Sequence, residues 1–107
     1  MGTTTEQLNV SATITAQNSF TDPLPLDIGE IASISFINTS SFTGTITLQR
    51  QLPGQTTWQD VPDPDGNFGW TAATEQSYAS DERQLIRLGC KTGGYSSGTA
   101  TVRLGKG

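Results

Sequence analysis

Hydrophobic and polar residues alternate along most of this chain, which is typical of strands with one buried face. Five segments show the alternation: 8–14, 31–37, 44–50, 86–90 and 100–104. We expect their inward positions to form the core (Leu8, Val10, Ala12, Ile14, Ala32, Ile34, Phe36, Ile46, Leu48, Ile86, Leu88, Cys90, Ala100, Val102 and Leu104).

Turn residues separate these segments. Asn38–Ser41, Pro53–Gly54, Pro62–Asn67 and Thr92–Gly94 combine Asn, Asp, Gly, Pro and Ser in the way that predicts reversals of the chain. At Pro53–Gly54, proline presets φ and glycine accepts a positive φ, so this corner is predicted to be a hairpin hinge.

The hinge is followed by a strand over 56–61, in which Trp58 and Val61 are expected to be buried anchors. Phe68 and Trp70 are expected to share one face of the next short strand. Aromatic side chains in phase with the alternation are typical of a two-sheet core.

Two stretches do not follow the alternation. Segment 21–26 contains Pro23 and Pro25, which cannot donate to a β-ladder, so it is predicted to be an edge or connecting segment. Segment 71–82 leaves two alternatives: a helical turn, or a loop or irregular strand around Tyr78. The surrounding β pattern favours the second.

About seven strands at roughly ten-residue spacing predict an all-β fold, namely an antiparallel β-sandwich, Ig-like or jelly-roll-like. Two facing sheets are needed because one layer cannot bury its apolar face. The 107 residues suffice for one domain, 1–107, with short tails expected at 1–7 and 105–107.

Net charge and composition limit the classes of binding partner and the cellular location that we expect. The net charge is −4 and the six basic residues form no run, which argues against nucleic acid as a partner. No segment has the apolar length of a membrane helix, and no signal peptide is recognised, so we expect synthesis and folding in a reducing cytoplasm.

The residues for catalysis are scarce. Histidine is absent, and the single cysteine, Cys90, is in phase with buried positions, so no base–nucleophile pair and no zinc set is predicted. Asp60, Asp63 and Asp65 precede Gly66–Asn67, but no acid follows where a calcium loop would need one, which favours a turn over weak calcium binding. We expect no enzyme, cofactor or metal.

The C-terminal three-fifths of the chain resembles a family of short phage-encoded β domains. The resemblance is carried by short motifs that occur in the same order in that family (Thr47-Leu48-Gln49-Arg50, Thr57-Trp58, Arg87-Leu88-Gly89, Gly94-Tyr95-Ser96-Ser97-Gly98-Thr99 and Thr101-Val102-Arg103-Leu104). The chain departs from the family's Ser-x-Asp-Gly-Gly-x-Thr-Trp turn, because Pro53 and Gln55 replace the acid and the second glycine.

This resemblance implies a non-enzymatic virion protein, above all a capsid decoration (cement) protein that binds the major capsid protein or other virion proteins. Symmetric self-association, with a trimer favoured, would multiply weak contacts. The expected contact residues are Asp22, Pro23, Leu24, Pro25 and Tyr95, together with segment 1–7.

The alternative is a carbohydrate-binding or host-adhesion module of a tail or neck fibre. Trp58, Trp70, Tyr78 and Tyr95 could stack on sugar rings if their faces were exposed and coplanar. Exposure of Trp70, Tyr78 and Tyr95 therefore separates the two hypotheses.

Overall fold

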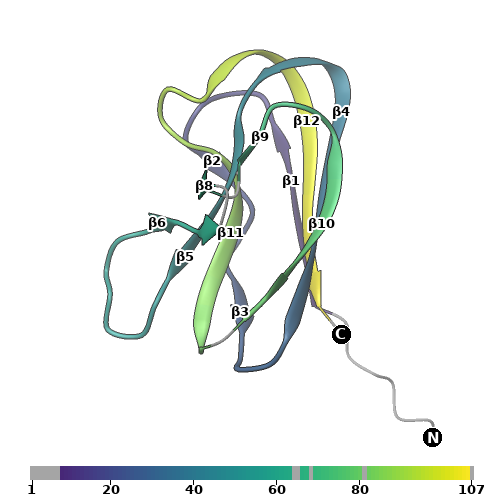
Figure 1. Cartoon of the computed structure of the whole chain (residues 1–107). Helices are drawn as coiled ribbons and strands as arrows, with labels where there is room; N and C mark the ends of the chain where they lie inside the picture. Colours follow the sequence, from purple (N-terminus) through teal and green to yellow (C-terminus); the bar gives the residue numbers. More distant parts are fainter. Residues whose placement is uncertain (1–7, 64–65, 68, 81, 107) are drawn as a thin grey trace, which may run out of the picture.

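Two antiparallel sheets pack face to face in the computed structural model, which describes residues 8–63, 66–67, 69–80 and 82–106 (Figure 1). Sheet A has the strand order β1 (Leu8–Ile14), β12 (Tyr95–Lys106), β4 (Ile31–Gly44), β10 (Thr74–Ala79). Sheet B has the order β2 (Ser19–Phe20), β11 (Gln84–Cys90), β5 (Ile46–Gln51), β6 (Gln59–Asp60). The predicted all-β sandwich is confirmed.

Shorter strands complete the arrangement. In sheet B, β3 (Leu24–Leu26) also pairs with β11, and β9 (Gly69–Trp70) pairs with β5. A separate small pair is formed by β7 (Pro62–Asp63) and β8 (Gly66–Asn67). The predicted break at 62–67 therefore contains an antiparallel strand pair, and residues 64–65 and Phe68 lie outside the described residues.

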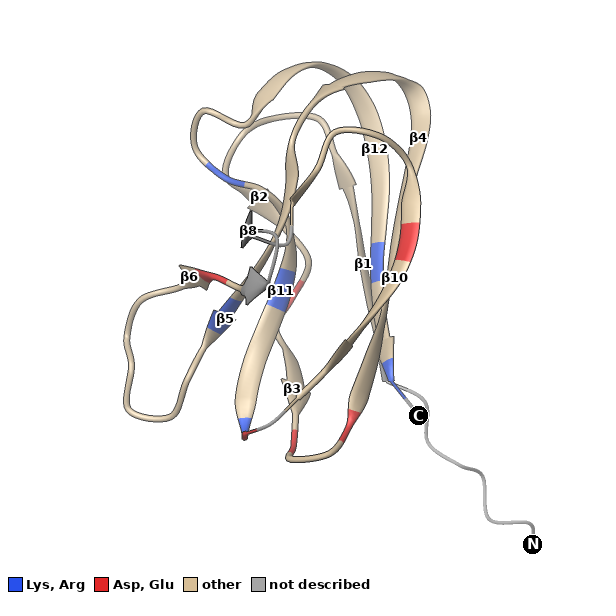
Figure 2. Ribbon diagram, viewed as in Figure 1, with Lys and Arg blue, Asp and Glu red and all other residues tan. Residues whose placement is uncertain are grey.

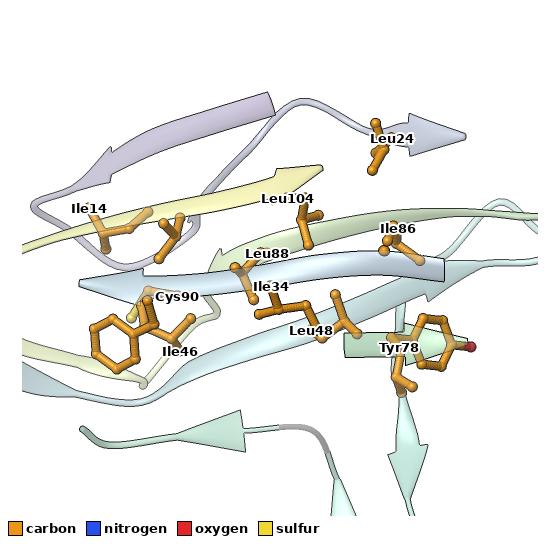
Figure 3. Close-up of a cluster of buried hydrophobic side chains, with 14 of the residues drawn as sticks. Ile14, Leu24, Ile34, Ile46, Leu48, Tyr78, Ile86, Leu88, Cys90 and Leu104 are labelled. Carbon is orange, nitrogen blue, oxygen red and sulfur yellow. The ribbon is translucent and has the colours of Figure 1, made fainter. Parts of the chain in front are cut away.

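The core lies between the sheets and contains most of the inward positions that the alternation predicts, together with Leu24 and Tyr78 (Figure 3). Val10 and Ala12 are only partly buried against it, and the Leu8 side chain lies outside the description. Sheet B contributes fully buried side chains to this core (Ile46, Leu48, Ile86 and Leu88). Sheet A contributes Ile34, Val102 and Leu104 to the same cluster. Cys90 is also fully buried, as expected.

The turn predicted at Asn38–Ser41 is wrong, because β4 continues through it. The ladder with β12 shifts register here, with Thr99 opposite both Ser40 and Ser41, and Ser41 has a φ of 47°. The Asn38 amide accepts from the Phe42 N–H at 2.9 Å and donates to the Phe42 carbonyl at 3.1 Å. Asn38 thus stabilises a β-bulge instead of a reversal.

Segment 71–82 is more regular than predicted, since β10 forms a six-residue ladder with β4. Tyr78 is only 8% exposed, and its hydroxyl donates to Gln84 Oε1 at 3.0 Å. Of the two alternatives, the structure has the strand. Tyr78 anchors it through its buried ring and its hydrogen bond to Gln84.

The C-terminal tail is shorter than expected. Gly105 pairs with both Asn9 and Ser33, and Lys106 pairs with Leu8, so β12 runs through Lys106. Segment 1–7 and Gly107 lie outside the described residues.

Candidate partner-binding surface

Segment 22–26 lies at the edge of sheet B, as its prolines predict. Asp22, Pro23 and Pro25 are exposed, whereas Leu24 is 1% exposed and buried in the core. Alternate positions of a strand face opposite sides, so Leu24 faces inward and Pro25 outward. The prediction of Leu24 as a partner contact is therefore wrong.

A cavity of about 500 Å³ opens beside this segment. Its walls come from β3 and the turn after it, from the loop between β5 and β6, and from the start of β11. These elements meet at one end of the sandwich, at the bottom of Figure 1, which we call the cavity end. Its apolar lining is Pro25, Leu26, Leu52, Pro53 and Leu85.

Acidic and basic residues lie close together along the ribbon at the cavity end (Figure 2), and the four charged side chains of the lining form two ion pairs. Lys106 Nζ lies 2.8 Å from Glu30 Oε1. This bond, together with the N–H of Asp27 at 2.7 Å, holds the pKa of Glu30 below its ordinary value. Arg83 lies 3.7 Å from Asp27 and is well exposed, so that pair contributes little stability. Two acids and two bases leave the lining neutral, which suits a partner with an apolar contact surface.

Exposed isoleucines extend the apolar surface of the cavity end. Ile28 is 70% exposed in the turn after β3, and Ile31 is 58% exposed at the start of β4. Ala79, also exposed, is the cross-strand partner of Ile31. Among the described residues, the other large exposed hydrophobic residue is Ile37, at 53%, farther along β4. Apolar surface is therefore concentrated at the cavity end.

The predicted hinge at Pro53–Gly54 is confirmed. The Gln55 N–H donates to the Leu52 carbonyl at 3.0 Å, and Gly54 has a φ of 85°, which glycine tolerates without strain. The Gln55 side chain also accepts from the Leu52 N–H at 3.0 Å. Because Leu52 to Gln55 line the cavity, the hinge also forms one of its walls, which the local sequence did not indicate.

The prediction that Trp58 is a core anchor is wrong. Trp58 is half-buried on the outer side of sheet B, where the Arg87 guanidinium carbon lies 4.5 Å from its ring centroid. The same carbon lies 3.9 Å from the Phe20 centroid. Val61, the second expected anchor, is fully buried.

A chain of polar contacts continues from this stack across sheet B. Arg87 donates twice to Gln49 Oε1, at 3.0 and 2.7 Å, and Gln49 donates to Asp60 at 3.0 Å. Lys91 pairs with the other Asp60 oxygen at 2.5 Å. Burial alone would raise the pKa of Asp60, but the bonds from Lys91 and Gln49 outweigh it and hold this pKa below its ordinary value. Because these side chains bind one another, we interpret this series of polar contacts as stabilising the fold.

Of the four aromatic rings proposed for sugar stacking, Trp58 lies on the outer side of sheet B against Arg87, and the other three are packed inward. Tyr78 is buried. Trp70 and Tyr95 are partly buried against the core. The Tyr95 hydroxyl donates to the Gly98 carbonyl at 2.9 Å, and its ring lies 6.0 Å from Phe42. Tyr95 is thus less available than expected, and it begins β12, whose other end, Lys106, lines the cavity.

The described residues offer little for chemistry. Desolvation raises the pKa of the buried Cys90 thiol, which disfavours a reactive thiolate. Within the described ranges, no three side chains of His, Cys, Asp or Glu group as metal ligands. The Asp63 side chain and Asp65, which belonged to the calcium alternative, lie outside the description.

Comparisons with protein-family models, with curated proteins and with solved structures find no match to this chain. No helix in the described part of the chain has the length and apolarity to span a membrane.

Proposed function

We propose that this chain is a non-enzymatic structural protein of a bacteriophage particle, acting as a capsid decoration protein on the outer surface of the head. The proposal starts from the resemblance of residues 44–107 to phage β domains. The observation that carries it is the cavity end, where the turn after β3 contributes Asp27 and Glu30 to a neutral, partly apolar cavity and exposes Ile28, with the exposed Ile31 next to Glu30 in the chain. Exposed apolar patches of this kind mark protein contact sites.

In this proposal, the cavity end binds the major capsid protein. The segment around Pro23 and Pro25, expected to contact a partner, lies at this end, and the β5–β6 loop adds Leu52 and Pro53. Proline residues and the bonded corner at Leu52–Gln55 restrict the backbone, which lowers the entropy lost on binding. Many copies on a repetitive head would add avidity to a modest single contact.

The test is cosedimentation of the purified chain with phage heads that lack it, comparing Ile28→Glu with Ile37→Glu. Both changes add one acid at an exposed isoleucine, but only Ile28 lies at the cavity end. We expect I28E to weaken binding about tenfold or more, which is roughly 1.4 kcal/mol, and I37E to bind like the parent chain.

Equal binding by both variants would reject the cavity end as the contact, and absence of the protein from purified particles would reject the virion role. The adhesion alternative predicts hits on a glycan array. The inward packing of Tyr78, Trp70 and Tyr95 argues against that alternative, because stacking needs free ring faces.

A further inference from the structure

The edges of the two sheets differ in how they resist pairing with other strands. Sheet B ends on one side at β2 and β3, where Pro23 and Pro25 supply no N–H, and on the other side at two-residue strands. In sheet A, the edge strand β10 carries the exposed Glu75. Prolines, short strands and charges are the usual protections of an edge.

Strand β1, at the other edge of sheet A, has none of these protections. Its seven residues, LNVSATI, contain no charge, proline or glycine. The ladder with β12 runs without a register shift from Leu8 to Ile14, and β12 is the one strand that pairs with β1 in the described residues. A long, regular and uncharged edge is a template for another strand.

The side chains of β1 also leave apolar surface at this edge. Val10 and Ala12 pack against the core yet are only half-buried, while Asn9, Ser11 and Thr13 are exposed on the outer face. An added strand would cover Val10 and Ala12 and would bond the outward backbone groups.

We propose that β1 pairs with β1 of a second copy of this chain, antiparallel, across a two-fold axis at Ser11. This register places Ser11 opposite Ser11, Val10 opposite Ala12, and Asn9 opposite Thr13. Apolar side chains meet apolar ones on one face, polar meet polar on the other, and no like charges oppose each other. Sheet A then continues across the dimer as one eight-stranded sheet.

The self-complementary register is the reason for choosing a second copy as the occupant. A strand centred on one residue pairs with itself about a two-fold axis without exchanging its faces, and the isologous interface closes without leaving a free edge at β1. This inference is independent of the virion role and replaces the expected trimer with a dimer.

The experiment measures the mass of the full chain by sedimentation velocity, for the parent, Ser11→Lys and Ser77→Lys. Ser77 is the control, because it is an exposed serine on the other edge strand of sheet A. Its cross-strand neighbour is Ser33, whereas that of Ser11 is Arg103. We expect the parent and S77K to reach twice the monomer mass of 11.4 kDa at high concentration. We expect S11K to stay at the monomer mass, because two lysines would oppose each other, each also opposite Arg103 in its own sheet.

An equimolar mixture of S11K and Ser11→Glu should restore the doubled mass, which separates loss of pairing from loss of folding. If S11K does not fold, oxidation of the Ser11→Cys variant tests the pairing instead. It should give a disulfide-linked dimer, whereas Ser77→Cys should not. Cys90 is buried and does not compete for the disulfide. A parent chain that remains monomeric, a threefold mass, or equal effects of S11K and S77K would overturn the proposal.

Discussion

The outer faces of the two sheets differ in what covers them. On sheet A, the outward hydroxyl residues Thr13, Ser33 and Ser77 are exposed, and Ser35, at 8%, is the exception on β4. On sheet B, the outward Thr47 and Gln49 are only 3% and 7% exposed, and Gln49 bonds to Arg87 and Asp60. A polar residue in an alternating strand therefore faces away from the core, yet it reaches solvent only where no loop or neighbouring side chain covers it.

Glycine substitutions should show the largest difference between the two faces. A Cβ at Gly89 in sheet B would lie 2.1 Å from the Ser19 carbonyl oxygen and 2.6 Å from Phe20 Cα, so backbone would have to move. We expect Gly89→Ala to reduce the free energy of unfolding by about 2–4 kcal/mol in urea titration.

The control for Gly89 is Gly105 in sheet A. A Cβ there would meet the Asn9 side-chain oxygen at 2.6 Å and Arg103 Nη1 at 2.9 Å, both at the ends of flexible side chains. We expect Gly105→Ala to cost less than about 1 kcal/mol. Equal losses for the two variants would contradict the difference between the faces.

Arginine substitutions should give an intermediate effect. Arg87→Met removes the guanidinium that contacts Phe20 and Trp58 and leaves Gln49 Oε1 without its donor. We expect a loss of about 2 kcal/mol in unfolding free energy, with a change in tryptophan fluorescence. Arg103→Met, on the exposed face of sheet A, should change the unfolding free energy by no more than about 0.5 kcal/mol. A loss as large as that of R87M would contradict the inference that the covered face of sheet B contributes more stability.

The smallest expected effect is on the pH dependence of folding stability, to which Asp60 of sheet B contributes. Its folded pKa lies below the ordinary value of 3.8, so its contribution is present above that pH and is lost as pH falls through the folded pKa. The free energy of unfolding should fall less steeply below about pH 4 in Asp60→Asn than in the parent chain, and the difference should be less than about 1 kcal/mol. Lys91→Met should have a similar effect; an unchanged profile in both variants would refute this role.

Much of the core could be read from local sequence. Ile46, Leu48, Ile86 and Leu88 alternate with polar residues, and burial of one strand face requires that period. The prolines of segment 22–26 likewise predicted an edge, because a missing N–H has the same effect in any fold.

The errors came from interactions between distant residues. Asn38–Ser41 has turn chemistry, but a neighbouring strand, β12, pairs on both sides of it and converts it into a bulge. Trp58 has the phase of a core residue, but Arg87, twenty-nine positions later in the numbering, provides a cation for its ring outside the core. The cavity end joins four segments, from β3, the β5–β6 loop, β11 and the end of β12, and no single one of them indicates a cavity.

The sequence by itself determined the strand period, the inward positions and the hinge at Pro53–Gly54, because each follows from the stereochemistry of a few adjacent residues. Only the tertiary structure decided which polar face is covered, where Trp58 lies, that the hinge forms a cavity wall, and that β1 is an edge strand of sheet A. These properties depend on which strands become neighbours, and burial and backbone pairing between them are settled by contacts across the whole chain.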